Sequence, residues 1–309
     1  MNTNILGIDI GGTNLRMGIV SAAGELSGFE RVPTREVLES SNPPQALCEA
    51  IRRYASVHGG LGVVSAIAVG VPAVVAKDHS FVFSTPNISG LDNIDLGKSL
   101  EAELGLPVYV DRDVNFLLVH DIRKYSLDPD GRRTVLGCYL GTGFGNSLYI
   151  NGRIHLGSHG AAGELGHIPL YGVTDVCTCG QVGCVETRIS GRYLQHLTKE
   201  HFPQTFIGDV FKEHADAPEI RKFVSDIALT IATEVTLLDP DFVLLGSGVF
   251  AMQGFPMETL MEEIRRRSRH PLPAEDLHFV IAEDSQTAGV LGGAFTVLPY
   301  VEAGIPIRS

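Results

Sequence analysis

The sequence predicts an α/β fold made of two similar lobes, and three observations lead to that prediction. Short apolar runs that end at glycine turns alternate with amphipathic helical segments along the 309 residues. The order of strands and helices begins again near residue 134. Glycine contributes 35 residues, about 11% of the chain against a usual ~7%, which is typical of many tight turns. The repeated order indicates an internal duplication, and a cleft between two such lobes is the expected ligand site.

The first half opens with three predicted strands joined by glycine turns, which form an antiparallel meander. These strands are expected at Ile5–Ile10, Leu15–Val20 and Glu25–Val32. A helix and a buried strand follow, at Pro43–His58 and Val63–Val75. The half closes with a short helix, a strand and a second helix, predicted at Leu96–Leu104, Val108–Val110 and Val114–Tyr125.

The second half repeats this order. Its strands are expected at Thr134–Leu140, Asn146–Ile150, from Arg153 onward, Phe242–Leu245 and Leu277–Ala282. Its helices are expected at Pro218–Leu238 and Thr287–Val301. We expect a smaller N-terminal lobe of residues 1–115 completed by the C-terminal helix at about 290–309, and a larger lobe of residues 116–289.

Composition and charge exclude several classes of protein. The 24 basic and 36 acidic residues give a net charge of −12, opposite to that of most nucleic-acid binders. The basic cluster Arg265–His270 follows two glutamates and is interpreted as a solvated helix face. No apolar stretch reaches 18 residues, and the N-terminus lacks the pattern of a signal peptide. Five cysteines, an odd number, argue against a disulfide scaffold, so we expect a cytoplasmic protein. The charge and the lack of a long apolar stretch lead us to expect neither nucleic-acid nor membrane partners.

Two glycine turns, each after a buried strand, are candidates for binding phosphate through backbone N–H groups. The first contains Gly11, Gly12, Thr13 and Asn14, and the second contains Gly141, Thr142, Gly143 and Gly145. A dinucleotide-binding motif would require a helix directly after the glycines, whereas the second turn is followed by a hairpin at Asn151-Gly152. Ordinary glycine hairpins are the alternative, and the duplication favours a nucleotide-phosphate clamp.

The motifs resemble a known family. Asp9–Asn14 and Leu140–Gly143 resemble the phosphate loops of the sugar kinase/Hsc70/actin superfamily. Gly163–His167, followed by Cys177–Glu186, resembles the zinc motif of the ROK family of bacterial sugar kinases and repressors. The resemblance extends from about Asn4 to the last helix. It implies a two-lobed actin-like ATPase (ribonuclease H-like) fold with duplicated mixed-sheet domains around a central cleft, and ATP-dependent phosphorylation of a hexose 6-hydroxyl.

Three of the five cysteines lie close together in the sequence, at Cys177, Cys179 and Cys184. Thiolates and imidazole are good zinc ligands, and His167 could supply the fourth position of a closed, structural site. The family match favours zinc over an unrelated loop or a disulfide. Cys48 and Cys138 are expected to be ordinary buried cysteines.

Two aspartates are candidates for the chemistry. Asp113 follows a strand where a helix begins, so it could be a simple helix N-cap. Its match to the catalytic Asp of the family implies instead that it is the general base that accepts the proton of the sugar hydroxyl. By the same resemblance, Asp9 would orient Mg²⁺ near the ATP phosphates. A strand-end turn residue is the alternative for Asp9.

The family resemblance also assigns the substrate contacts. The sugar-binding residues that it implies are Asn87, Arg112, Asp113, Glu164, His167 and Glu186. Gly246 and Gly248 resemble the turn on the adenosine side. Because His167 is also a proposed zinc ligand, it would use one ring nitrogen for each role.

One position departs from the family pattern. The family usually has Asn directly before the catalytic Asp, but this chain has Arg112. Arginine offers five donors and a longer reach, so it would contact the sugar 3- and 4-hydroxyls differently. The resemblance implies D-allose as the best hexose, and Arg112 would meet its axial 3-hydroxyl differently from the equatorial 3-hydroxyl of glucose. An Arg112 side chain that turns to solvent or pairs with Asp111 is the alternative.

Several functional alternatives stay open at this point. A kinase for glucose, fructose or an N-acetylated hexosamine, or a non-catalytic sugar sensor, would fit much of the same pattern. Repressors of the family carry a helix-turn-helix before the first phosphate loop, and only eight residues precede Asp9 here, so we expect a kinase. The sequence sets no oligomeric state, and a homodimer is left open.

Overall fold

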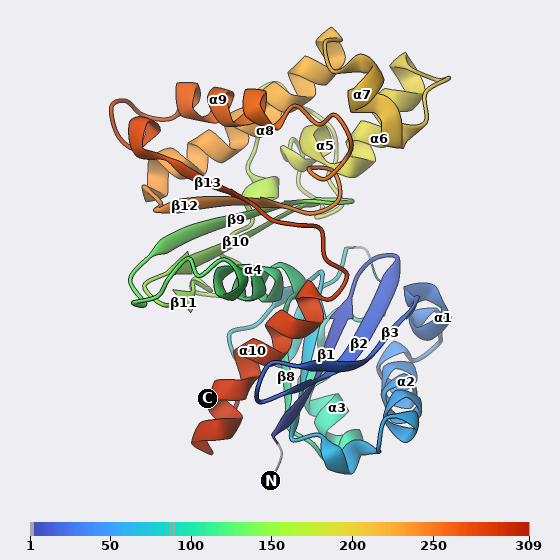
Figure 1. Ribbon diagram of the computed structural model, residues 1–309. Helices are drawn as coiled ribbons and strands as arrows, with labels where there is room; N and C mark the ends of the chain where they lie inside the picture. Colours follow the sequence, from blue (N-terminus) through green and yellow to red (C-terminus); the bar gives the residue numbers. More distant parts are fainter. Residues whose placement is uncertain (1–2, 87, 89, 309) are drawn as a thin grey trace. The chain divides into compact units, whose positions relative to one another are not determined.

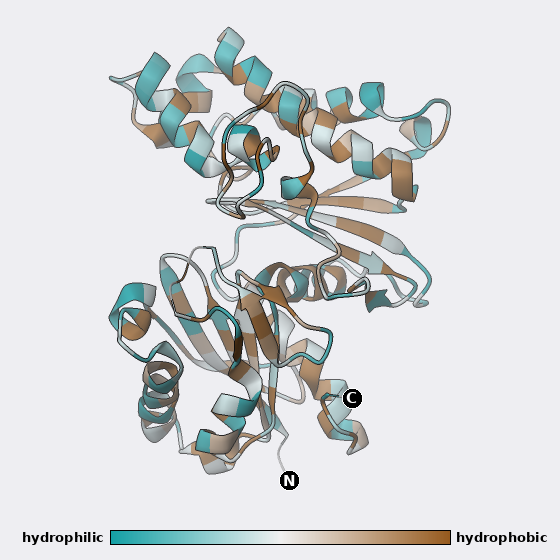
Figure 2. Cartoon of the chain, turned by 180° about the vertical axis from the view of Figure 1, so that it is seen from behind, coloured by the Kyte–Doolittle hydropathy of each residue, from teal (hydrophilic) through white to brown (hydrophobic). Residues whose placement is uncertain are grey.

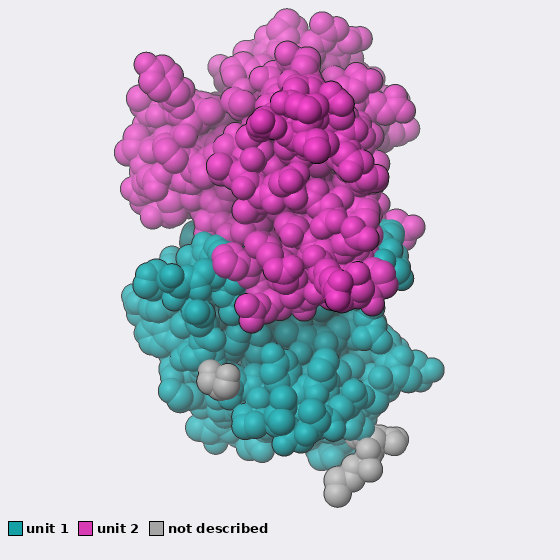
Figure 3. All heavy atoms as spheres, turned by 90° about the vertical axis from the view of Figure 1, so that its left-hand side faces the viewer, with its two compact units in different colours: residues 1–126, 156–162, 286–309 teal, residues 127–155, 163–285 magenta. Residues whose placement is uncertain are grey.

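The computed structural model describes residues 3–86, 88 and 90–308, and the chain divides into two compact units (Figure 3). Unit 1 comprises residues 1–126, 156–162 and 286–309, and unit 2 comprises residues 127–155 and 163–285. Helix α4 (Asp113–Lys124) belongs wholly to unit 1, whereas the lobe boundary expected at residue 115 would divide it. The reason is packing, because α4 lies along helix α10 (Ala288–Ala303) of the same unit.

Unit 1 is built on a five-stranded mixed sheet with the order β3-β2-β1-β4-β8 (Figure 1). Its strands are β1 (Asn4–Ile10), β2 (Asn14–Ser21), β3 (Leu26–Pro33), β4 (Ala66–Val71) and β8 (Val108–Arg112). The first three strands are antiparallel neighbours, which confirms the predicted meander. β4 is parallel to both β1 and β8.

Helices cover both faces of this sheet. One apolar cluster joins the sheet to α2 (Pro43–Val57) and α3 (Leu96–Leu104). A second cluster joins it to α10 and to Phe116 of α4. These clusters explain why the strands are largely hydrophobic while α2 shows a hydrophilic outer face (Figure 2).

Smaller elements complete unit 1. They are α1 (Thr34–Leu38) and a three-stranded antiparallel sheet of β5 (Val74–Val75), β6 (Phe81–Ser84) and β7 (Ile94–Asp95). The strand expected at Val63–Val75 is therefore two strands in different sheets. The division falls at Pro72, which has no N–H to donate to a sheet.

Unit 2 repeats the topology of unit 1. Its sheet has the order β11-β10-β9-β12-β13, and its strands are β9 (Thr134–Leu140), β10 (Phe144–Ile150), β11 (Arg153–Ile154), β12 (Phe242–Gly246) and β13 (His278–Ile281). β9, β10 and β11 are antiparallel neighbours, while β12 is parallel to β9 and β13. The predicted internal duplication is thus confirmed.

Two long helices pack together in unit 2: α8 (Pro218–Leu238) and α9 (Met257–Arg267). The buried face of α8 carries Ile220, Phe223, Ile227, Ile231 and Val235, which recur at helical spacing. Shorter helices are α5 (Glu186–Ile189), α6 (Gly191–His201) and α7 (Val210–His214). No helix within the described part of the chain has both the length and the hydropathy needed to span a membrane.

Candidate functional site

In unit 1 three parallel strands end at one edge of the sheet, and the predicted site residues follow those ends. β1 runs parallel to β4 and β4 runs parallel to β8, so their carboxyl ends share an edge. Asp9 is the penultimate residue of β1, and Asp113 directly follows β8. In α/β proteins this carboxyl edge is where ligands usually bind.

The first glycine turn connects β1 to β2 at the same edge. Within it, the Gly11 amide donates a hydrogen bond to the Asn14 carbonyl at 2.9 Å. The Thr34 hydroxyl, from the start of α1, donates to the Gly11 carbonyl at 2.6 Å and steadies the turn from outside. Gly12 and Thr13 at its tip are exposed, so the tip is accessible to a ligand.

Asp9 lies beside a cation that the sequence analysis missed. Its Oδ2 is 3.1 Å from Nη1 of Arg16, which faces it in the register of the β1–β2 hairpin. The same guanidinium donates to Oε1 of Gln286 from Nε at 3.2 Å and from Nη2 at 2.9 Å. Burial raises the pKa of Asp9, and the charge of Arg16 opposes that rise. Arg16 could have been found by pairing the residues on either side of the hairpin.

The start of α10 also approaches Asp9. A Cβ built on Gly289 would lie 2.6 Å from the Asp9 carboxyl carbon, so this position of α10 requires glycine. The strand end, the hairpin and the helix therefore hold the Asp9 carboxylate together.

Asp113 is the first residue of α4, and the N-cap position belongs to Arg112. Oδ1 of Asp113 accepts from the Val114 amide at 2.8 Å, whereas a capping side chain bonds two or three residues ahead. The simple N-cap interpretation of Asp113 is therefore wrong. The side chain is only partly buried, which suits a group that must meet a substrate.

Arg112 is buried, with 5% of its surface exposed. Its Nη1 donates to the Ala162 carbonyl at 2.7 Å, so the side chain does not turn out to solvent. The neighbouring Asp111 carboxylate accepts from the Arg112 backbone amide at 2.7 Å. Asn87, the remaining sugar contact predicted in unit 1, lies outside the described residues.

The second glycine turn, in unit 2, is bound to the carboxylate predicted to hold sugar. Oε2 of Glu186 accepts from the Phe144 amide at 2.9 Å, and a Cβ on Gly143 would lie 2.7 Å from the same oxygen. The glycine is thus required for the approach of Glu186. The Gly141 and Thr142 carbonyls accept from the amides of Gly191 and Arg192, which begin α6. Gly145 lies within β10 rather than in the turn.

The predicted adenosine-side turn lies at the same edge of the unit 2 sheet. β12 is parallel to β9 and ends at Gly246, and the Val249 amide donates to the Leu140 carbonyl at the end of β9 at 2.9 Å. Ser247 between the two glycines has a φ of +77°, and Gly248 is exposed. The structure therefore brings the two unit 2 turns side by side.

The four predicted zinc ligands form one cluster. The ligand atoms of His167, Cys177, Cys179 and Cys184 all lie within 4.8 Å of one another. Nδ1 of His167 is 3.5 Å from the Cys177 sulfur, and the sulfurs of Cys179 and Cys184 are 3.6 Å apart. Ligands about 2.3 Å from a tetrahedral zinc lie about 3.8 Å from one another, so the residues fit the ion. All five cysteines are free thiols, so the disulfide alternative is wrong.

His167 connects this cluster to a carboxylate. Its other ring nitrogen, Nε2, is 3.6 Å from Oε2 of Glu164. The short 3-10 helix Leu165–His167 packs against β10 and α5. The cluster therefore holds His167, whose ring contacts the predicted sugar-binding carboxylate Glu164, and the predicted Glu186 lies two residues after the ligand Cys184.

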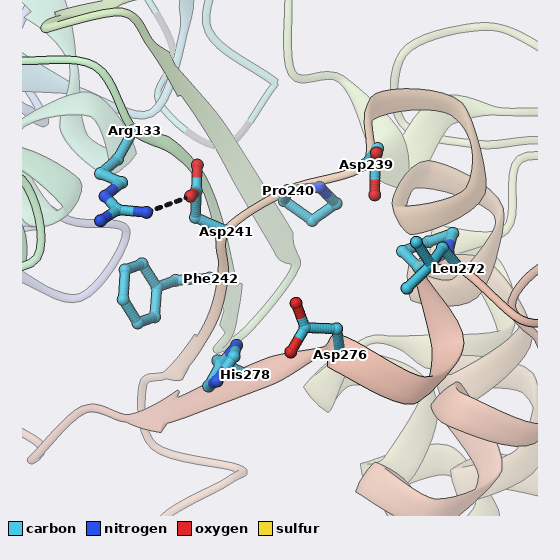
Figure 4. Close-up of a pocket in the computed structure, with 9 residues that line it drawn as sticks. Arg133, Asp239, Pro240, Asp241, Phe242, Leu272, Asp276 and His278 are labelled. Atoms are coloured by element: carbon cyan, nitrogen blue, oxygen red, sulfur yellow. Dashed lines mark hydrogen bonds and ion pairs between the residues drawn. The ribbon is translucent and has the colours of Figure 1, made fainter.

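A pocket of about 480 Å³ lies elsewhere in unit 2, at the amino ends of β12 and β13 (Figure 4). Its lining residues are Arg133, Asp239, Pro240, Asp241, Phe242, Leu272, Pro273, Asp276 and His278. Nη1 of Arg133 pairs with Oδ1 of Asp241 at 2.6 Å. None of the predicted site residues that the structure describes lines this pocket, and the two glycine turns of unit 2 follow the opposite, carboxyl ends of β9 and β12.

Known proteins resemble the chain over nearly its whole length. A glucokinase of Halalkalibacterium halodurans is 29% identical, with 94% of each chain covered. An N-acetyl-D-glucosamine kinase of Yersinia enterocolitica is 30% identical, with 94% of this chain and 97% of the relative covered. Among solved structures, a ROK family glucokinase from Streptomyces griseus in complex with glucose and AMPPNP has a TM-score of 0.75 at 25% identity, covering 95% of this chain and 98% of that one.

These likenesses agree with the duplicated sheets and confirm the predicted actin-like ATPase fold. The model of the ROK family matches residues 5–299, which include both glycine turns and the cysteine cluster. The chain belongs to the ROK family.

Proposed function

We propose that the protein is a cytoplasmic, ATP-dependent hexose kinase that phosphorylates the sugar 6-hydroxyl. The observation that carries the proposal is the position of Asp113 at the strand edge that also holds Asp9 and the first glycine turn. A phosphoryl-transfer enzyme needs a base for the acceptor hydroxyl and groups that bind the phosphates. The names of the curated relatives, glucokinase and N-acetyl-D-glucosamine kinase, support the substrate class.

The proposed reaction assigns the proton to Asp113. Its carboxylate accepts the proton of the 6-hydroxyl while the sugar oxygen forms a bond to the γ-phosphorus. The bond between that phosphorus and the bridging oxygen of ADP breaks, and ADP leaves with the electron pair. The glycine turns would donate backbone N–H groups to the phosphates from Gly12 and Thr13 on the first turn and from Thr142 and Gly143 on the second, because the Gly11 and Gly141 amides are bonded within their own turns.

Two metals belong to the proposal. Mg²⁺, when bound with ATP, neutralises charge on the phosphates. Asp9, whose carboxylate is paired with Arg16, is the residue that would orient it. Zinc at the cluster of His167, Cys177, Cys179 and Cys184 would be structural, since four protein ligands leave no open position.

Arg112 is the residue that we propose for the choice of sugar, with D-allose as the best hexose. It replaces an amide with a group that only donates hydrogen bonds, and it lies directly before the proposed base. A sugar hydroxyl left unpaired in a buried site costs about 1–3 kcal/mol, or one to two decades of kcat/KM. The relatives' names favour a second candidate, glucose or N-acetylglucosamine.

An assay of sugar-dependent ADP release tests both levels of the proposal. The panel contains allose, glucose, fructose, mannose and N-acetylglucosamine with Mg-ATP. We expect the highest kcat/KM with allose, and a smaller allose-to-glucose ratio in Arg112→Asn. A different best sugar would overturn the allose assignment alone. No ADP release with any sugar would overturn the kinase and leave a non-catalytic sugar binder.

A further inference from the structure

Asp111, two residues before the proposed base, is held more firmly than a strand-end residue requires. Its side chain is buried, with 4% of its surface exposed. Oδ1 accepts two hydrogen bonds, from the Arg112 amide at 2.7 Å and from Nδ2 of Asn115 at 2.7 Å. Asn115 is itself 2% exposed and lies in the first turn of α4. One carboxylate oxygen therefore connects the last residue of β8 to the first turn of the next helix.

The second oxygen of Asp111 is also confined. Oδ2 lies 3.6 Å from Nδ1 of His79, a nitrogen that is buried and makes no hydrogen bond within the described residues. The His79 ring stacks on Tyr109, with the ring centroids 4.1 Å apart, and its Nε2 is 3.0 Å from the Tyr109 hydroxyl. The Val110 amide donates to the His79 carbonyl at 2.9 Å. His79 thus lies against the carboxylate oxygen of Asp111 that is not bonded to Asn115.

The residues between these contacts are the two that carry the proposed chemistry. Arg112 and Asp113 lie between Asp111 and Asn115, so the hydrogen bond between Asp111 and Asn115 spans the backbone from which both side chains project. Rotation of that backbone would move the Asp113 carboxylate, and a displacement of about 1 Å in a reacting group can lower a rate by about 10²-fold. Burial in a packed site leaves Asp111 few other conformations.

We infer that Asp111 is a positioning residue, which, with Asn115, fixes the turn between β8 and α4 and so directs the Asp113 carboxylate toward the acceptor hydroxyl. The inference rests on the proposed function, because it assigns a purpose to the orientation of Asp113. Asp111 touches no reacting atom in this scheme. It acts through an acceptor oxygen at a fixed place and not through its charge.

The test compares kcat with KM in a set of variants of the full chain, using the best sugar of the panel. Asp111→Ala removes the acceptor, and we expect kcat to fall at least tenfold while the KM for Mg-ATP changes less than threefold. Asp111→Asn keeps an acceptor oxygen of the same reach and should restore most of that turnover. Asn115→Ala removes one of the two donors and should give an intermediate kcat.

Asp95→Ala is the matched control. The Asp95 side chain also holds the start of a helix of unit 1, accepting from the Lys98 amide at the start of α3 at 3.1 Å. It should lower the melting temperature without lowering kcat. Wild-type kcat in folded Asp111→Ala, or equal losses in Asp111→Asn and Asp111→Ala, would overturn the inference. If Asp111→Ala fails to fold, unchanged kcat in Asn115→Ala has the same force.

Asp113→Asn separates this inference from the proposed function. Full activity in Asp113→Asn would refute the proposed base itself. A large loss in Asp113→Asn together with normal kcat in Asp111→Ala would refute only the positioning role.

Discussion

Single carboxylates in this protein differ in what surrounds them, and the differences separate their roles. Asp9 is paired with Arg16 beneath the glycine turn, Asp111 is enclosed by Asn115 and His79, and Asp113 is partly accessible at the start of α4. Of the three, Asp111 is buried, whereas Asp9 and Asp113 are partly exposed. The proposed assignment of the base to Asp113 rests on its position at the start of α4, directly after β8.

The first prediction concerns that base. Asp113→Asn should lower kcat by at least ~10², the lower end of the effect of general-base catalysis, since the amide cannot accept the proton. Sugar binding, measured by calorimetry without ATP, should persist. Asp130→Asn, at an exposed loop position, is the control and should behave as wild type. Near-normal turnover of folded Asp113→Asn would rule out this role.

A second prediction concerns Glu234, a buried residue of α8. Burial raises its pKa from 4.5 to about 7, and a hydrogen bond from Nδ2 of Asn146 at 2.9 Å opposes the rise. Because the folded pKa lies above the unfolded one, the folded state binds the extra proton and stability falls as pH rises from about 4.5 to 7. The loss should be about 3 kcal/mol, at 1.36 kcal/mol per pKa unit.

Glu234→Gln should remove most of this pH dependence and raise the free energy of unfolding at pH 8. Urea unfolding between pH 5 and 8 measures both effects. Glu219→Gln, a partly exposed residue in the first turn of the same helix, is the control and should keep the wild-type slope. A slope in Glu234→Gln equal to that of wild type would show that other groups cause it.

The loop that carries the cysteine cluster has several apolar side chains that are not buried. Tyr171, Val176 and Val182 of this loop are exposed, so burial contributes little to its order. The loop is held by backbone bonds such as Cys177 N–H to the Gln181 carbonyl, at 2.8 Å, and by the four proposed ligands. A metal bound only in the folded state adds directly to folding free energy.

Cys179→Ser should therefore lose the zinc and lower the melting temperature together. Cys179 is exposed, so the substitution alone removes little packing. Elemental analysis and thermal unfolding with and without a chelator provide the measurement. Cys48→Ala, a buried cysteine of α2, is the control and should lose stability but keep one zinc per chain. Purified wild type that is fully active without zinc would contradict the assignment.

Elements with local end signals were predictable from the sequence. α3 and α8 have the expected bounds, because Gly105 ends the first in the left-handed conformation and Pro218 begins the second. α6 was missed, although Ser190 caps it by accepting from the Tyr193 amide at 3.2 Å. Its signal was hidden by the irregular segment before it.

Contacts between residues that lie far apart in the chain could not be predicted from the sequence. Asp9, Asp113 and the cysteine cluster could be identified as candidate site residues, because each lies in a short motif of characteristic residues. The bond from Arg112 to the Ala162 carbonyl joins residues 50 apart, and no local pattern announces it. The pairing of Asp9 with Arg16 across one hairpin is of intermediate difficulty, because it can be predicted once the register of the two strands is known.

The two units share the same sheet order, but they are assembled from different numbers of chain segments. Unit 1 is assembled from three segments of the chain, whereas residues 127–155 and 163–285 form unit 2. The last segment supplies α10, whose buried face carries Val290, Ala294, Val297 and Leu298 at helical spacing. This face packs on Ile5, Ala66 and Ala68 of the unit 1 sheet.

Disruption of that face should unfold unit 1 selectively. Val297→Asp places a charge in the buried cluster, so we expect loss of the unit 1 transition in urea unfolding and increased binding of a hydrophobic dye. Glu302→Lys, exposed on the same helix, should leave both measurements unchanged. Equal behaviour of the two variants would show that α10 is dispensable for the stability of unit 1.

Because α10 lies near the C-terminal end of the chain, it is synthesised well after the unit 1 sheet on which it packs. About 160 residues separate the end of α4 from the segment that contains α10, and ribosomes add about 5–20 residues per second. The apolar face formed by Ile5, Ala66 and Ala68 is complete about 220 residues before Ala288, so it emerges about 10–45 s before the helix that covers it. Throughout that interval the nascent chain offers this face to chaperones, and unit 1 can close only after the sequence of unit 2 has been synthesised.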